Sequence, residues 1–73
     1  MDSLQLDSLV EEMIEAQRAR LLALARRLVP DITPEDLLQP HDHGALAAHP
    51  DYNFEDGVLA GYLAVRAALR ASR

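Results

Sequence analysis

Apolar residues in the first part of the chain recur at steps of three and four, which is the spacing of one helix face. They are Leu6, Leu9, Val10, Met13, Ile14, Leu21, Leu24 and Leu28, with one double step across Gln17. The pattern predicts a long helix over residues 3–29. Asp2 with Gln5 forms a capping-box pattern at its start, and Pro30 disfavours helical backbone at the residue before it.

Two further helices are predicted downstream. Thr33 followed by Pro34 is typical of a helix start, and Pro40 limits that helix to residues 34–39. A longer helix is expected over 54–71, with Asn53 as its N-cap. Its large apolar face consists of Phe54, Val58, Tyr62, Val65 and Leu69. Its seam of small residues consists of Gly57, Gly61, Ala64, Ala68 and Ala71.

The seam of small residues predicts that another helix comes close to it, because glycine inside a helix costs roughly 1 kcal/mol relative to alanine. The first helix has a matching small set in Ala16, Ala19 and Ala23. Residues 39–53, between the helices, are expected to be an irregular but ordered connection, with one possible helical turn at 45–48. Its expected apolar anchors are Leu46, Tyr52 and Phe54.

These elements predict an all-α fold, an antiparallel helical hairpin forming one small domain over residues 1–73. Hydrophobic residues make up 49% of the chain but aromatic residues only 4%, so the core is expected to consist mainly of Leu, Val and Ala. Leu37 and Leu38 are expected to fix the short helix to the longer ones. The absence of cysteine excludes disulfides and thiolate metal sites.

The last helix is expected to be about a third shorter than the first, which would leave part of the long apolar stripe uncovered. A homodimer with a four-helix arrangement would cover it. Gln17 interrupts a heptad series, so it either fixes the register of such a dimer or faces solvent. The interface is predicted at Leu6, Val10, Ile14, Gln17, Leu21, Leu24, Gly57 and Gly61.

Charge and hydropathy limit the expected partners. The net charge of −5 argues against general binding to nucleic acid or to an anionic membrane surface. The longest apolar run, residues 58–65, is far shorter than the ~20 residues of a membrane span, and no basic region precedes an apolar run at the N-terminus. A cytoplasmic location is therefore expected.

Three histidines in the connection form a candidate metal site. His41, His43 and His49, with Asp42 and Asp51, supply imidazole and carboxylate groups that can bind Zn²⁺ or another divalent cation. The same residue types beside Pro and Gly are also ordinary turn-forming residues. Both interpretations remain open from the sequence.

Glu11, Glu12 and Glu15 spell E-E-x-x-E on the first helix. This resembles half of the Mg²⁺ site of the all-α nucleotide pyrophosphohydrolases, a family whose second half is E-x-x-D on a facing helix. Here Glu55 and Asp56 are adjacent, and Val58 stands where the aspartate should be. The chain is therefore not assigned to that family, and a solvated acidic face is the preferred interpretation.

The function expected from these features is a small, non-enzymatic protein–protein interaction module that associates with itself and needs no cofactor. The alternative is a small metal-binding protein or hydrolase subunit that uses the histidines of the connection. Neither a phosphate-binding glycine-rich loop nor a plausible catalytic triad is evident.

Overall fold

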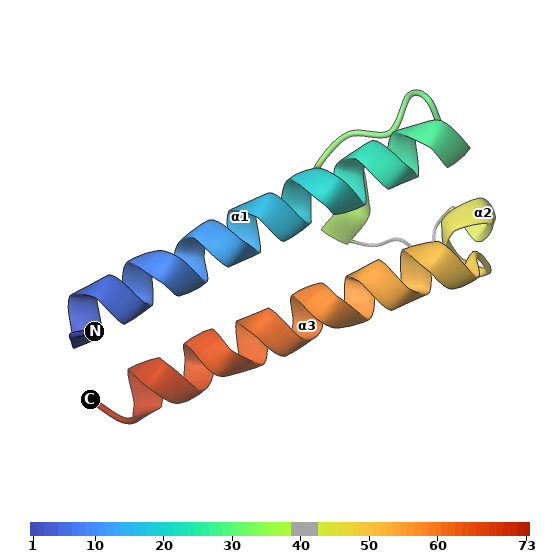
Figure 1. The fold of residues 1–73 in the computed structure, drawn as a ribbon. Coiled ribbons are helices and arrows are strands. Elements are labelled where there is room, and N and C mark those ends of the chain that lie inside the picture. Colours follow the sequence, from blue (N-terminus) through green and yellow to red (C-terminus); the bar gives the residue numbers. More distant parts are fainter. Residues whose placement is uncertain (39–42) are drawn as a thin grey trace.

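The computed structural model describes residues 1–38 and 43–73, and these residues form helices and no strand. The elements in chain order are α1 (Ser3–Leu28), the 3₁₀ helix η1 (Asp36–Leu38), α2 (Gly44–Ala47) and α3 (Pro50–Ala71). The prediction of an all-α fold is confirmed. α1 and α3 lie side by side and antiparallel, with the two termini at one end and the shorter elements towards the other (Figure 1).

Both ends of α1 lie within one residue of the positions predicted from sequence. The Asp2 carboxylate accepts a hydrogen bond from the main-chain N–H of Gln5 at 2.8 Å. The Asp2 main-chain N–H donates to Gln5 Oε1 at 2.9 Å, which completes the capping box. The helix ends at Leu28, and the C-cap Val29 is already extended because Pro30 follows it.

The start of α3 differs from the prediction. The helix begins at Pro50 with His49 as N-cap, so the assignment of Asn53 as N-cap is wrong. Proline is well suited to the first helical position, because its fixed φ is helical and its missing N–H would have no partner there. Asn53 lies inside the helix, and its side-chain amide donates to the main-chain oxygen of Ala47 at 3.1 Å.

The earlier start gives α3 a length of 22 residues, against 26 for α1. The expectation that the last helix is a third shorter is therefore wrong. The difference in length is therefore not what leaves Leu6, Leu9 and Met13 of the α1 stripe between 36 and 40% exposed.

The segment after α1 forms the 3₁₀ helix η1 over Asp36–Leu38, which starts later than the predicted helix over 34–39. Asp36 Oδ2 accepts from the Thr33 N–H at 3.0 Å, and the Asp36 N–H donates to Thr33 Oγ1 at 3.3 Å. Leu37 packs against the core, but Leu38 is 82% exposed, so its expected anchoring role is wrong. The end of the predicted helix, from residue 39, lies outside the described residues.

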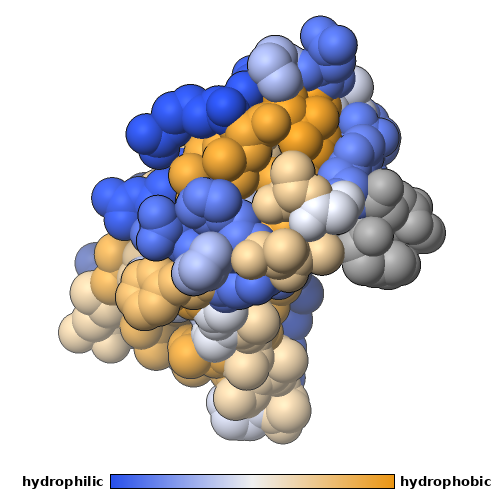
Figure 2. Space-filling view, turned by 90° about the vertical axis from the view of Figure 1, so that its right-hand side faces the viewer, coloured by the Kyte–Doolittle hydropathy of each residue, from blue (hydrophilic) through white to orange (hydrophobic). Residues whose placement is uncertain are grey.

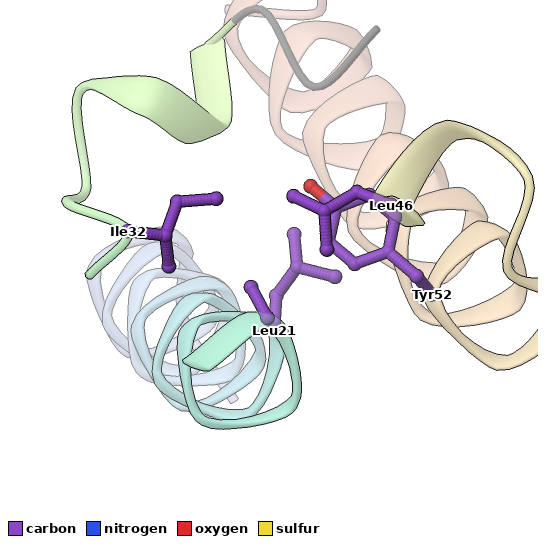
Figure 3. Packing of buried hydrophobic residues seen from close by; sticks show 5 residues of the cluster. Leu21, Ile32, Leu46 and Tyr52 are labelled. Carbon is purple, nitrogen blue, oxygen red and sulfur yellow. The ribbon is translucent and has the colours of Figure 1, made fainter. Parts of the chain in front are cut away.

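The main cluster of buried side chains lies at the end of the molecule that carries the shorter elements. Leu21, Ile32, Leu46 and Tyr52 converge there from four segments of the chain (Figure 3). The expected helical turn near residues 45–48 is present as α2, and Leu46 and Tyr52 anchor it as predicted. Phe54 is 69% exposed and is not an anchor.

No helix in the described parts of the chain combines the length and apolar character needed to cross a membrane.

Candidate interaction face

One face of α1 is buried against α3 and the core cluster. It consists of Val10, Ile14, Gln17, Leu21 and Ala25. We call this set the inner seam. Its steps of four, three, four and four keep the residues on one side of the helix over most of its length. The inner seam therefore uses the predicted apolar stripe to hold the two long helices of one chain together.

Gln17 is the polar member of the inner seam, and it is only 5% exposed. Its side-chain amide Nε2 donates to the main-chain oxygen of Glu55 at 2.9 Å and to Glu55 Oε2 at 2.6 Å. The solvent-facing interpretation of Gln17 is wrong. Its hydrogen-bonding requirement is met by α3 of the same chain, as burial of an amide demands.

Ion pairs join α1 and α3 towards the end that carries the termini. Arg66 donates to both carboxylate oxygens of Glu11, at 3.2 and 3.3 Å, and Arg70 approaches the same carboxylate at 3.6 Å. Arg73 pairs with Asp7. These pairs are partly exposed, so each contributes roughly 1 kcal/mol at most to the stability of the fold. Together they show which residues of α1 lie beside which residues of α3.

One flank of the pair of long helices is hollowed into a groove where the chain returns from α1. Leu22 and Leu59 lie in this groove together with Pro34, Leu37 and Leu38. Leu22, Leu37 and Leu59 pack against the core cluster, so this flank is partly covered by the protein's own chain.

The other flank carries a second row of residues on each long helix. On α1 the row is Leu6, Leu9, Met13, Ala16 and Arg20. On α3 the row is Phe54, Val58, Gly61, Val65 and Ala68. We call these two rows together the outer face. Both rows follow steps of three and four, so each lies along one side of its helix.

The two rows lie on the same side of the molecule. Met13, Ala16 and Arg20 of α1 line one shallow hollow with Tyr62 of α3. Arg20 also lines a second hollow with Phe54. The two rows therefore adjoin at Arg20 and Phe54, on the flank opposite the groove at Leu22 and Leu59.

The outer face leaves large apolar side chains in contact with solvent. Phe54 is 69% exposed, Val65 50%, and Leu6, Leu9 and Met13 between 36 and 40%. Apolar surface between hydrophilic residues is also visible from the end that carries α2 (Figure 2). Isolated apolar residues on a surface are normal, but two parallel rows of them are typical of an interface.

The residues predicted for a dimer interface divide between these surfaces. Val10, Ile14, Gln17 and Leu21 belong to the inner seam, and Leu24 is half-buried beside it. Leu6 and Gly61 lie on the outer face, and Gly57 is exposed near its edge. Sequence reasoning missed Leu9, Met13, Phe54, Val58 and Val65 as interface candidates, although their heptad spacing was a signal that could have identified them.

The glycines of α3 do not contact α1. A Cβ atom built on Gly57 or Gly61 has nothing within 4 Å, apart from neighbours in its own helix. Ala16, Ala19 and Ala23 of α1 are also exposed. The expectation of close approach at these small residues is therefore wrong for the two helices of one chain.

The predicted metal site is only partly within the described residues. His41 and Asp42 lie outside them. His43 and His49 are the N-caps of α2 and α3, and neither side chain bonds to the helix that it precedes. Within residues 1–38 and 43–73, no three His, Asp or Glu side chains are placed to hold a metal ion. Metal binding by the three histidines stays a prediction.

Two of the three glutamates in the E-E-x-x-E pattern, Glu11 and Glu15, are engaged with arginine rather than gathered around one point. Glu11 pairs with Arg66 and Arg70, and Glu15 pairs with Arg18 at 3.0 Å. Glu55, on the facing helix, accepts from Gln17. This arrangement suits the interpretation of a charged surface better than that of half a Mg²⁺ site.

Two titratable groups of the shorter segments have shifted pKa values. Hydrogen bonds from the main-chain N–H and hydroxyl of Thr33 lower the pKa of Asp36, because they favour its charged form. Burial raises the pKa of Tyr52, with a further contribution from the negative charge of Asp56. Tyr52 Oη and His49 Nδ1 are buried without a hydrogen-bond partner among the described residues.

No protein-family model, curated protein or solved structure matches this chain.

Proposed function

We propose that this chain is a non-enzymatic helical interaction module that associates with a second copy of itself through the outer face. The observation that carries the proposal is the second heptad row on each long helix. The inner seam already provides the apolar contact between α1 and α3. Of the outer face, Arg20 approaches Glu55 at 4.0 Å, but the exposed apolar side chains of the two rows remain in contact with solvent. Phe54 and Val65, both at least half exposed, lie in the α3 row.

The size of the outer face fits a stable interface. The protein measures 41 × 19 × 17 Å, and the outer face extends along its longest dimension. One full side of a molecule of those dimensions has about the area that each partner buries in a typical specific interface, ~800 Å². Covering leucine-sized side chains there contributes roughly 25 cal/mol for each Å² of apolar surface removed from water.

A second copy is the partner that this surface suits best. Two hairpins packed through matching two-helix faces form a four-helix arrangement, and two-fold symmetry lets the same surface serve both chains. This proposal keeps the predicted homodimer and, of its predicted interface, Leu6 and Gly61. It no longer includes Val10, Ile14, Gln17 and Leu21, which form the inner seam.

Sedimentation velocity at micromolar concentration tests the proposal. We expect the wild-type chain to sediment as a dimer. The double variant Met13→Glu with Val65→Glu places a charge in each outer row, and we expect its dissociation constant to rise at least 100-fold. Leu4→Glu is the control, because Leu4 is 78% exposed and lies outside the outer face.

The control is expected to remain dimeric, and circular dichroism shows whether each variant stays helical. A wild-type chain that is monomeric up to 100 μM would contradict the proposal. A folded dimer of the double variant would show that self-association uses another surface.

A further inference from the structure

The two rows of the outer face have a regular order of large and small residues. With the next heptad positions included, the α1 row reads Asp2, Leu6, Leu9, Met13, Ala16, Arg20, Ala23 and Arg27. The α3 row reads Phe54, Val58, Gly61, Val65, Ala68 and Ser72. The centre of the α1 row lies between the large Met13 and the small Ala16, and the centre of the α3 row lies between the small Gly61 and the large Val65.

These two centres are level with each other. Glu11, just before the centre of the α1 row, bonds to Arg66, just after the centre of the α3 row, at 3.2 Å. Since α1 and α3 are antiparallel, the residues before the centre of the α1 row lie at the same end of the molecule as the residues after the centre of the α3 row. Met13, Ala16 and Tyr62 also line one hollow. A single two-fold axis can therefore pass through both centres.

Building on the proposed self-association, we infer that the second copy binds with this axis perpendicular to the helices. α1 then packs antiparallel on α1 of the second copy, and α3 packs antiparallel on α3 of the second copy. Met13 faces Ala16 of the second copy on one pair of helices. Val58 faces Ala68, and Val65 faces Gly61, on the other pair. Each of these large side chains meets a small one, which allows two helices to interlock closely.

Charge along the α1 row supports the same orientation. Asp2 lies at the acidic end of the row, and Arg20 and Arg27 lie in its other half. In the antiparallel contact, Asp2 comes level with Arg27 of the second copy. Leu9 comes level with Arg20, whose aliphatic stem can cover it while the guanidinium group stays in water.

The other face-to-face two-fold arrangement has its axis along the helices and packs α1 on α3 of the second copy. It would bring Leu9 level with Ala68, Met13 level with Val65, and Ala16 level with Gly61. The contact between Met13 and Val65 would be crowded, and the contact between Ala16 and Gly61 would leave a void. Both faults are costly in a packed interface, so the size order favours the first arrangement.

Disulfide trapping distinguishes the two arrangements, and the chain contains no natural cysteine to interfere. Single-cysteine chains are mixed at equal concentrations as full-length proteins, oxidised and separated by mass. Leu9→Cys mixed with Arg20→Cys is expected to give a rapid mixed disulfide. Leu9→Cys alone is expected to crosslink at least tenfold more slowly, because the two copies of residue 9 lie ~16 Å apart at 1.5 Å per residue.

Leu9→Cys mixed with Ala68→Cys is the matched comparison. A fast crosslink in that mixture, with none between residues 9 and 20, overturns the inferred orientation while leaving the dimer itself in place. The proposed function would fail in a different way: the wild-type chain, without crosslinking, would then sediment as a monomer. All three sites are at least partly exposed, and circular dichroism of each variant confirms that it is folded.

Discussion

The side-chain amide of Gln17 joins α1 to Glu55 of α3 by two hydrogen bonds, one to a main-chain oxygen and one to a carboxylate. Gln17 is almost completely shielded from water. The pair therefore fixes the relative position of the two long helices at a point where the rest of the inner seam is apolar. An apolar seam alone would tolerate small shifts of one helix along the other, whereas this pair would not.

The Gln17–Glu55 contact gives the first prediction. Gln17→Ala is expected to lower the free energy of unfolding by about 1.5–3 kcal/mol, since it removes a bond to a charged acceptor. Urea denaturation of both chains at one protein concentration measures the change. In a double-mutant cycle with Glu55→Ala, the loss caused by Gln17→Ala should shrink. Purely additive losses would mean that the two residues do not interact.

Ile14 gives the second prediction, because its side chain is completely buried in the inner seam. Ile14→Ala is expected to lower the free energy of unfolding by about 2–5 kcal/mol, through lost burial and the cavity that remains. Leu4→Ala is the matched control on the same helix. Leu4 is 78% exposed, so its truncation should cost less than about 0.5 kcal/mol. Similar losses for the two variants would place the core elsewhere.

Local signals in the sequence predicted the α1 ends and the all-α class, because capping and proline chemistry act between neighbouring residues. The start of α3 was missed although Pro50 and Asp51 repeat the pattern of Pro34 and Glu35. His49 lacks the side-chain oxygen of a favoured N-cap, so the residues before Pro50 do not mark a helix start.

The identity of the inner seam was harder to predict. Val10, Ile14, Gln17 and Leu21 have heptad spacing, but so do Leu6, Leu9, Met13 and Ala16 on the neighbouring side of the helix. Periodicity identifies both rows as suitable for helix packing. It does not say which row contacts the same chain, because that depends on where α3 lies and on the partner that Gln17 finds at Glu55.

Tyr52 gives the third prediction, since its buried hydroxyl has no partner among the described residues. Tyr52→Phe keeps the ring in the core cluster and removes a polar group that lost its water on burial. The free energy of unfolding at pH 7 is therefore expected to stay within about 1 kcal/mol of the wild-type value, and to be unchanged or higher. A loss of 2 kcal/mol or more on urea denaturation would mean that the hydroxyl is bonded in solution.

The pH dependence of Tyr52 gives the fourth prediction. Burial raises the pKa of its hydroxyl above 10.0 in the folded chain, so folding favours the protonated form. The corresponding stability is fully present below pH 10 and is lost as the pH rises through the folded-state pKa. Wild type should lose more stability than Tyr52→Phe when urea denaturation is repeated above pH 10. Equal losses would show that Tyr52 titrates normally.

The two glycines of α3 give the last prediction. Neither would bring a methyl group against another part of the chain, so Gly57→Ala and Gly61→Ala should each stabilise the helix by about 0.5–1 kcal/mol. They should differ in self-association, because the inferred orientation sets only Gly61 opposite Val65 of the second copy. Sedimentation equilibrium should give a weaker dimer for Gly61→Ala than for Gly57→Ala. Equal dissociation constants would mean that Gly61 is not at a close helix contact.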